Sequence, residues 1–518
     1  MQKNLVLAVI LSSLVYIGWY SFMEKRIQPQ KTAETQQAAV QQQAAQPPAP
    51  ASQAASPAAA PASQSAPLPG NWKEKAVKLT AGKAEYYFNA ESASLAGAVY
   101  EGPVAPVELI PDPNRSFFYA TLPGRFSLKR ATADTVEFEA RQDKLILRRA
   151  YSVSPDNGLN KLSISVTNTS SAPLLLPAWE LRVGPGLDTV PSEQKENEKL
   201  CKADYAFTEN GRKHPTLKEL KDSPAEHDWV WTGLNNRYFL AALADSSFAG
   251  TRPLRRNETV GKNEKTPALV VPMPAAELKP GETREWTSGF YLGPKDYTRL
   301  QALGLGLDRS VDFGFFAPLA KLANSSLVFF YHVTGNYGAA ILILSVLIQL
   351  LLTPLSFKSY KAMAIMKKIQ PEMQAIQKRY KDDPQRMNSE IMALYKRHGT
   401  NPLGGCLPML LQIPVFFALF TALRNSWNLH GAHFIFWIKD LSAKDPYYVL
   451  PLVMGGVMFL QQHLNPQTSD PAQATMMKWM PVIFTFMFLR FPAGLVLYWL
   501  VNSTWGFAQT MYLKKQTA

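Results

Sequence analysis

The side chains that could do chemistry in this chain are uncharged polar groups placed inside long apolar segments. They are Gln349, Gln412, Asn425, Asn502 and Ser503. A polar group inside a membrane is costly and usually faces a cavity or a neighbouring helix. These positions therefore predict either a polar cavity within a helical bundle or, taking each residue alone, a hydrogen bond between two helices.

Patterns for catalysis, metal binding and cofactors are scarce. No glycine-rich phosphate loop precedes a lysine, no G-x-S-x-G motif occurs, and the apolar segments hold no paired acids. Cys201 and Cys406 are too few for a disulfide framework, and neither has a Cys or His neighbour at metal-ligand spacing. We therefore expect neither an enzyme nor a metal site nor a bound cofactor.

The composition divides the chain into chemically different parts. Its 518 residues carry a formal charge of +14, and 47% of them are hydrophobic. Thirteen of the 16 methionines follow Tyr360. Because the positive charge is local, its position along the chain indicates the partner better than its sum does.

The first 70 residues predict a membrane anchor and a linker. Residues 4–23 are uncharged, and a helix of that length can cross a bilayer. Tyr and Trp residues near its end, with no small-x-small cleavage site following, favour an uncleaved signal anchor (1–25) over a cleaved signal peptide. Residues 26–70 are rich in Ala, Gln and Pro, and we expect a disordered linker.

Residues 71–308 predict a β-rich soluble domain. The alternation of apolar and polar residues at 162–167 is typical of a half-buried antiparallel strand. Turn sequences at 155–158 and 279–281 separate such runs, and the whole pattern predicts a large β-sandwich. The strand-like runs are 84–88, 135–140, 145–153, 162–167, 268–271 and 286–292.

The remaining residues predict a membrane domain. Residues 309–330 suit an amphipathic helix lying at the membrane interface. A shorter span is expected at about 474–490, because the long side chains of Lys478 and Arg490 can reach the interface. Together with the N-terminal anchor, we count six transmembrane helices, five of them in residues 331–518. The longer uncharged segments are 338–357, 399–423, 446–469 and 491–513.

Residues 358–400 predict a cytoplasmic helical hairpin. Ten Lys and Arg residues against four acids lie between Lys358 and His398, so the positive-inside rule places this segment and both termini in the cytoplasm. The β-rich domain then lies outside, in the periplasm of a bacterium. Pro371, the pair Asp383-Pro384 and Gly399 mark helix starts and a helix end.

A methionine-rich stripe runs along the predicted hairpin. It could bind varied partners, or it could only join the two helices to each other. The basic face has a similar alternative, because anionic lipid headgroups alone would explain it. The predicted contact residues are Met363, Met366, Met373, Lys378, Arg379 and Met387.

Three long motifs stand in the second half of the chain. They are NPLGGCLPMLLQIPVF at 401–416, KDLSAKDPYYVLP at 439–451, and MPVIFTFMF at 480–488 followed by FPAGLVLYW at 491–499. The chain resembles, over essentially its whole length, the bacterial YidC family of membrane-protein insertases in its Gram-negative form. The resemblance implies a chaperone that inserts and folds inner-membrane proteins without ATP, and a β-supersandwich for the outer domain.

The resemblance also implies partners. Nascent membrane proteins would be the substrates, and the chain would act alone or with SecYEG and SecDF. Few residues follow Lys514, so the hairpin is a better candidate than the C-terminal tail for contacts in the cytoplasm. Its candidate partners are the ribosome, the signal recognition machinery and anionic lipids. No specific nucleic acid is expected.

In this family, five core helices form a hydrophilic groove that is open to the cytoplasm and to lipid and closed to the periplasm. A hydrophobic slide beside the groove lets a substrate helix leave sideways. By match to the motifs, the groove residues are Gln349, Gln412, Asn502 and Ser503. The slide residues are Leu407, Pro408 and Leu411 on the third span and Ile483, Phe484 and Phe488 on the fifth.

One position departs from the family pattern. The family usually has a positive residue five positions before the Pro of its Thr-Pro-Leu motif, and counting back from Pro354 gives Gln349. The charge that would attract acidic substrate tails is therefore replaced by an amide. Two other functions stay open. One is a solute transporter, although we do not recognise the matched internal repeats typical of transporters. The other is an envelope glycan-binding protein that acts through the β-rich domain.

Overall fold

The structure is a computed structural model, and it describes residues 68–155, 158–209, 214–248, 250–260, 264–401, 407–464 and 471–517. The chain divides into two compact units, 1–60 and 61–518, and all described residues belong to the second. The predicted signal anchor, the predicted linker up to residue 67, and Cys406 lie outside the described residues.

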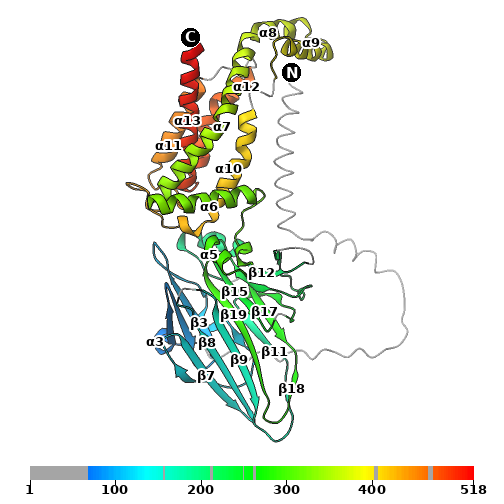
Figure 1. Cartoon of the computed structure of the whole chain (residues 1–518), viewed down its shortest axis with the longest axis vertical. Coiled ribbons are helices and arrows are strands. Elements are labelled where there is room, and N and C mark those ends of the chain that lie inside the picture. Colours follow the sequence, from blue (N-terminus) through cyan, green and yellow to red (C-terminus); the bar gives the residue numbers. More distant parts are fainter. Residues whose placement is uncertain are drawn as a thin grey trace, which may run out of the picture. The chain divides into compact units, whose positions relative to one another are not determined.

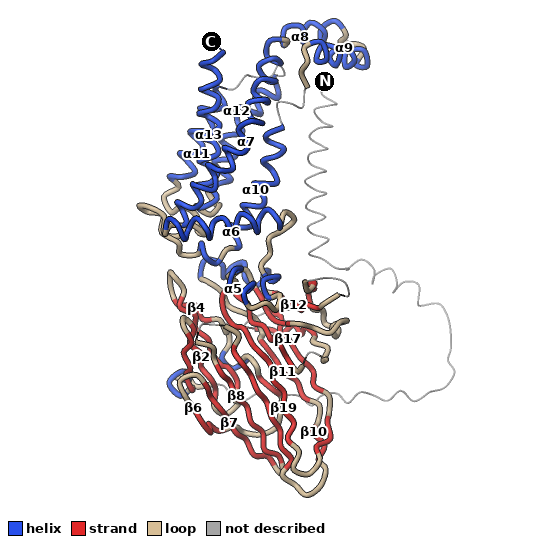
Figure 2. Tube along the Cα trace, viewed as in Figure 1, coloured by secondary structure: helices blue, strands red, loops and turns tan. Residues whose placement is uncertain are grey.

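The β-rich part is built from antiparallel sheets (Figures 1 and 2). The largest sheet has nine strands, in the order β13 (Thr216–Glu219), β12 (Lys202–Phe207), β14 (Trp231–Asn235), β15 (Phe239–Ser246), β19 (Thr283–Pro294), β9 (Asn160–Asn168), β8 (Leu145–Ser152), β7 (Thr135–Gln142) and β6 (Ser127–Ala131). A four-stranded sheet has the order β1 (Val77–Ala81), β2 (Ala84–Asn89), β3 (Ser94–Glu101) and β4 (Pro106–Glu108). A second has the order β16 (Leu254–Val260), β17 (Glu264–Met273), β11 (Trp179–Val183) and β5 (Tyr119–Ala120), while β10 (Leu174–Leu176) pairs with β18 (Ala276–Leu278).

The strands form where the sequence predicts them. In β9, Leu162, Ile164 and Val166 are fully buried, whereas the residues between them are partly exposed, so the predicted alternation is confirmed. The strand lies between β8 and β19, and this position explains why one complete face is buried. The other predicted runs coincide with β2, β7, β8, β17 and β19.

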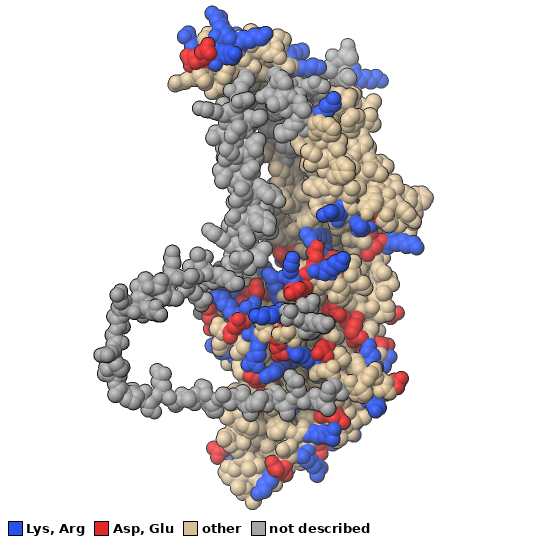
Figure 3. Space-filling view, turned by 180° about the vertical axis from the view of Figure 1, so that it is seen from behind, with Lys and Arg blue, Asp and Glu red and all other residues tan. Residues whose placement is uncertain are grey.

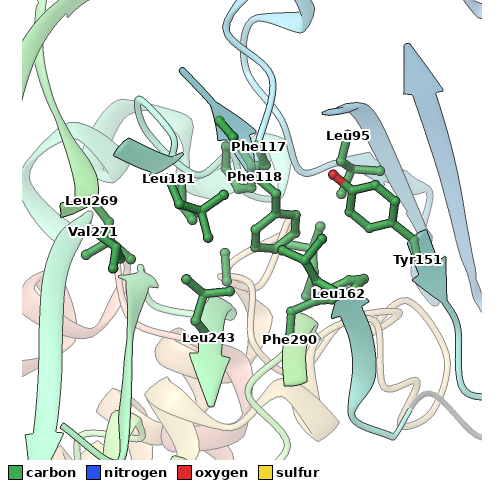
Figure 4. Packing of buried hydrophobic residues seen from close by; sticks show 14 of the residues in the cluster. Leu95, Phe117, Phe118, Tyr151, Leu162, Leu181, Leu243, Leu269, Val271 and Phe290 are labelled. Carbon is green, nitrogen blue, oxygen red and sulfur yellow. The ribbon is translucent and has the colours of Figure 1, made fainter. Parts of the chain in front are cut away.

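The core of the β-rich part lies between the large sheet and the two four-stranded sheets (Figure 4). Leu162 and Phe290 from the large sheet face Leu181 and Val271 from β11 and β17. Tyr151 is also fully buried, and its hydroxyl donates a hydrogen bond to the Ala93 carbonyl over 2.8 Å. This bond satisfies the polar end of an otherwise apolar side chain, so the ring can be buried without an unpaired donor.

The second half of the chain is helical. Short helices connect or flank the strands: α3 (Trp72–Lys75), α4 (Gln194–Leu200), α5 (Tyr297–Ala302), and the 3-10 turns η1 (Pro113–Arg115), η2 (Pro191–Glu193) and η3 (Leu307–Ser310). The long helices are α6 (Ala317–Thr334), α7 (Tyr337–Lys368), α8 (Gln370–Arg379), α9 (Pro384–Arg397), α10 (Leu407–Asn425), α11 (Val449–Leu464), α12 (Pro471–Phe488) and α13 (Ala493–Thr517).

The predicted spans of the membrane domain correspond to α7 and α10 to α13. Among the described residues, α7 is the one helix long and apolar enough to cross a membrane by itself. Shorter apolar helical stretches occur at Leu410–Asn425, Val449–Leu464 and Met477–Phe488. Helices therefore form at each predicted position after residue 331, whereas the count of six transmembrane helices stays a prediction.

The interfacial helix begins later than predicted. Residues 311–316 are not helical, because Asp312 accepts a hydrogen bond from the Gly314 amide and Gly314 has a φ of 66°. That left-handed backbone interrupts a helix and is readily adopted by glycine. Helix α6 therefore starts at Ala317 and runs past the predicted end to Thr334.

The hairpin also begins later than predicted. Residues 358–368 continue α7 through Pro354, although proline removes one helical hydrogen bond. The Thr353 hydroxyl bonds the Gln349 carbonyl over 2.7 Å, and Ser356 bonds the Leu352 carbonyl, so neighbouring turns gain extra hydrogen bonds. The hairpin itself consists of α8 and α9, and Met363 and Met366 belong to α7.

The connection after α10 packs against the β-rich part. Trp427, in the 3-10 turn η5 (Trp427–Leu429), is 8% exposed, and its ring centroid lies 5.0 Å from that of Phe239 and 5.8 Å from that of Tyr100. Nearby, the Arg424 guanidinium lies 3.4 Å from a Glu196 carboxylate oxygen. A buried aromatic contact therefore joins the connection after α10 to the sheets, and an ion pair joins the end of α10 to α4.

Candidate functional site

The predicted groove residues lie on the contact between α7 and α13. Gln349 is 5% exposed, and its side-chain amide donates a hydrogen bond to the side-chain oxygen of Asn502. This bond uses one donor of Gln349 and the acceptor of Asn502, so both amides keep further capacity for hydrogen bonds. The Gln349 amide, at a position where the resemblance implies a cation, is thus held by a polar partner on α13.

One helical turn further along α7, Thr353 joins the two helices again. Its hydroxyl oxygen accepts hydrogen bonds from Trp505 Nε1 over 3.2 Å and from Gln509 Nε2 over 2.8 Å. Because the same hydroxyl donates to the Gln349 carbonyl, its donor and both of its lone pairs are in use. Thr353 is therefore the most densely bonded polar group of this contact.

A third contact lies near the hairpin end of α7. The Tyr360 and Thr510 hydroxyls are 2.7 Å apart, and Thr510 also donates to the Gly506 carbonyl. Tyr360 and Thr510 thus extend the row of hydrogen bonds beyond Pro354. We call the full set the polar ladder: Gln349, Thr353 and Tyr360 on α7, with Asn502, Trp505, Gln509 and Thr510 on α13.

Helical periodicity explains why these side chains meet. On α13, Asn502, Trp505 and Gln509 are spaced by three and four residues, so they share one face. On α7, Gln349 and Thr353 are four residues apart and share a face in the same way. Two polar stripes on otherwise apolar helices therefore face each other instead of lipid, as the cost of unpaired polar groups in a membrane requires.

Gln412 bonds to the same helix from another side. Its side-chain amide on α10 donates a hydrogen bond to the hydroxyl of Tyr498, which is buried. Tyr498 lies four residues before Asn502, so the bond continues the polar face of α13 away from the hairpin. The structure thus brings Gln349, Gln412 and Asn502 onto one helix contact surface, and it buries Ser503 on α13.

Asn425 does not belong to this group. Its side-chain amide donates a hydrogen bond to the Asp312 carbonyl over 2.7 Å, at the opposite end of α10. This bond fixes the end of α10 to a neighbouring loop, whereas the predicted bond would join two helices. His430, another polar residue of this connection, stacks on Trp427 with ring centroids 5.2 Å apart.

The predicted slide residues divide into exposed and enclosed side chains. Leu411 on α10 and Ile483 on α12 are exposed. Phe484 packs on Trp499 with ring centroids 5.9 Å apart, and Phe488 is fully buried against Trp499. Phe488 thus lies inside the bundle and not on its surface. Leu407 and Pro408 lie in the first turn of α10, where their side chains are outside the described residues.

One methionine of the predicted stripe joins the two hairpin helices. Met373 on α8 accepts a hydrogen bond from the Tyr395 hydroxyl on α9 over 3.3 Å, and Leu394 is fully buried. Asp383 caps α9 by accepting from the Arg386 amide, with Pro384 as the first helical residue, so this predicted helix start is confirmed. The hairpin's other predicted contact residues remain accessible: Met363, Met366 and Met387 are partly exposed, and Lys378 and Arg379 are exposed.

Sequence reasoning missed most of the polar ladder. Thr353, Trp505 and Gln509 were not among the predicted site residues, although the three-and-four spacing of polar residues along α13 was a usable signal. Among the described residues, no group of three or more His, Cys, Asp or Glu could hold a metal ion.

Comparisons with known proteins match both halves of the chain. The family model described as 60Kd inner membrane protein matches residues 329–518, and the model described as YidC periplasmic domain matches residues 100–323. A protein of Pelobacter propionicus named membrane protein insertase YidC is 36% identical over 557 residues, which cover 99% of each chain. One of the same name from Endomicrobium trichonymphae is 43% identical over 398 residues, covering 75% of each chain.

Among solved structures, the chain is similar to an active YidC insertase crystallised with its first transmembrane domain resolved. That similarity has a TM-score of 0.40 at 18% sequence identity and covers 84% of this chain and 91% of the other.

Proposed function

The chain belongs to the YidC family of membrane protein insertases, and from this premise we propose that the polar ladder lines the place where it receives the polar part of a substrate. The family relationship extends along the whole chain, because full-length relatives align with 99% of it. The family inserts membrane proteins without enzymatic chemistry, so what must be explained is a lowered barrier and not a covalent step.

The barrier to insertion is the transfer of a substrate's polar tail into hydrocarbon. Each polar group without a hydrogen-bond partner in the bilayer core raises the free energy by roughly several kcal/mol. The polar ladder offers amide and hydroxyl groups along the contact of α7 and α13, where a tail or the water around it can exchange hydrogen bonds. Such exchange shortens the distance over which the tail has no partners.

Neighbouring apolar surface would receive the substrate's hydrophobic segment. Leu411 on α10 and Ile483 on α12 are exposed, as is Leu410 next to Leu411. A substrate helix that packs there would leave into lipid without crossing the polar ladder. In this proposal, the buried Phe488 supports the slide by packing on Trp499 and does not itself touch the substrate.

The proposed orientation rests on charge. Segment 358–398 carries ten Lys and Arg residues, four at the end of α7 and six after it. On the face drawn in Figure 3, Lys and Arg gather at this end of the helices, beyond a surface of uncharged residues. The positive-inside rule then places the hairpin in the cytoplasm and the β-rich part in the periplasm of the inner membrane. SecYEG, SecDF, the ribosome and the signal recognition machinery are proposed as partners on the family resemblance alone.

The observation that carries the proposal is the hydrogen-bonded row of Gln349 and Thr353 with Asn502, Trp505 and Gln509. The test uses liposomes that contain only the full-length protein and a small one-span substrate with a polar tail. Protease protection of the tail measures insertion. We expect protection well above that of empty liposomes.

Variants then test the ladder itself. Thr353→Val removes the hydroxyl that bonds Gln349, Trp505 and Gln509, and insertion should fall several-fold. Ser345→Ala is the matched control, because the Ser345 hydroxyl bonds the Ile341 carbonyl of its own helix. Equal insertion by both variants and the unmodified protein would refute the proposed site, and no insertion by the unmodified, correctly oriented protein would refute autonomous function.

A further inference from the structure

A cavity outside the polar ladder lies between the C-terminal halves of α11 and α13. Its volume is about 570 Å³, within the range of roughly 300–1,000 Å³ typical of small-molecule sites. Phe459, Leu460 and Leu464 line it from α11, and Phe507 and Met511 line it from α13. Both sets have helical spacing, so each helix offers one continuous apolar face.

The two helices approach each other closely beside the cavity. A Cβ atom added to Gly506 would lie 2.5 Å from Gln461 Nε2, so the backbone of α13 closely approaches α11 at that level. From there the helices lead to their C-terminal ends, and the cavity lies between them. It is therefore a slot between two apolar helix faces, and it is open toward the outside of the bundle.

The slot is basic near the C-terminal ends of the two helices. Lys515 and His463 both line the cavity, and each lies in the last turn of its helix. The His463 ring lies against Phe459, with centroids 4.9 Å apart, which holds the imidazole over the slot. Lys515 is exposed and lies four residues beyond Met511 on the same face of α13.

The combination of an apolar slot and a cationic end identifies the class of ligand. We propose that this slot binds one phospholipid with a net negative headgroup, with an acyl chain between α11 and α13 and the phosphate at Lys515 and His463. Basic pockets between membrane helices on the cytoplasmic side suit anionic headgroups. Two other occupants fit less well. An apolar substrate helix has no group that would pair with the cation, and a second copy of the chain would bring the same positive charge and be repelled.

The preference must come from the headgroup. Lipid tails are as apolar as the side chains of the slot, so filling it with an acyl chain does not select one lipid over another. A single Lys near an anionic headgroup contributes about 1 kcal/mol, which corresponds to roughly a fivefold preference over a lipid without net charge.

The experiment uses the full-length protein in vesicles with a photoactivatable acyl chain on either phosphatidylglycerol or phosphatidylethanolamine. After illumination, mass spectrometry maps the cross-linked peptides. We expect phosphatidylglycerol to label the peptides that contain Phe459 to Leu464 and Phe507 to Lys515 about fivefold more than phosphatidylethanolamine does.

Two variants separate this site from general attraction to the membrane. Lys515→Gln should remove most of the preference at these peptides, whereas Lys378→Gln, which removes one charge from the hairpin, should leave it unchanged. Equal labelling by the two lipids, or equal loss in both variants, would overturn the proposal. Cross-links between two protein copies through these peptides would overturn it as well, because the slot would then be an interface between chains.

Discussion

Replacing Gln349 by arginine places a positive charge where the resemblance to the family implies one. In the structure, Gln349 is buried and donates to Asn502 on α13. An arginine there can keep that bond, since its guanidinium has five donors and Asn502 offers an acceptor. The substitution Gln349→Arg therefore adds a charge while retaining the neighbouring polar ladder.

The size of the effect follows from two opposing contributions. A guanidinium and a carboxylate about 8 Å apart attract by roughly 2 kcal/mol at an effective dielectric constant near 20, a factor of about 30 in binding. Placing arginine in the middle of a membrane helix costs about 2.5–3.5 kcal/mol on insertion scales, less where water and polar neighbours are present. The cost of burying the arginine is the same with and without a bound substrate, so it lowers the stability of the protein. Only the attraction to the carboxylate changes the binding of an acidic substrate.

The assay measures insertion into liposomes for two substrates that differ only in the tail. One tail carries two acidic residues, and the other carries the corresponding amides. Gln349→Arg should raise insertion of the acidic-tail substrate several-fold, at most about thirtyfold, and leave the amide-tail substrate unchanged. Gln349→Met is the neutral control, which removes the Asn502 bond at similar side-chain length.

One result would refute the electrostatic reasoning. If Gln349→Arg inserts the acidic-tail substrate less well than the unmodified protein, while the amide-tail substrate is unaffected, the added charge traps the tail or does not meet it. High salt gives a second check, because attraction in a hydrated groove weakens when the Debye length falls from about 10 Å at 0.1 M to about 3 Å at 1 M.

Three other predictions concern the hairpin and the β-rich part. Pro384→Ala should lower insertion by misdirecting the hairpin, because it loosens the start of α9 next to the Asp383 cap; unchanged insertion would show that this geometry is dispensable. Trp427→Ala should destabilise the contact of α10 with the sheets by about 3 kcal/mol, seen as a lower melting temperature, and a similar melting temperature would contradict the packing. Burial raises the pKa of Asp204 from 3.8 to about 6, so its contribution to stability is complete below about pH 4 and lost above about pH 6. The stability of Asp204→Asn relative to the unmodified protein should therefore increase by up to about 3 kcal/mol between pH 4 and pH 7, and a constant difference would exclude this titration.

Local sequence patterns predicted the elements that depend on local physics. The alternation at 162–167 gave β9, because a strand with one buried face needs period two. Asp383 and Pro384 gave the start of α9, because a cap and a proline act within one turn. In contrast, the sequence did not predict that α7 continues through Pro354 or that Tyr360, beyond the proline, bonds Thr510 on α13. A partner helix is not visible in the local sequence.

The candidate site was predicted in part for the same reason. Gln349 and Asn502 could be found individually, because each is a polar residue in an apolar segment. Their direct bond could not be found, since it depends on the rotation of α7 and α13 about their axes. Thr353 was missed because a threonine can satisfy its hydroxyl within its own helix, and its two acceptor bonds come from the other helix.

In the proposed function, the strength of the polar ladder determines whether the chain can insert substrates without an energy source. Hydrogen bonds between membrane helices contribute about 0.6 kcal/mol each on average and at most about 1.7 kcal/mol. The bonds of Gln349 and Thr353 with α13 therefore hold the helices together by only a few kcal/mol. Each polar group of a tail in hydrocarbon lacks a partner at a cost of about a few kcal/mol, the same order as the ladder bonds. Exchanging ladder bonds for bonds to the tail therefore changes the free energy little. Near balance is what a site needs if it must take up a polar tail and release it again.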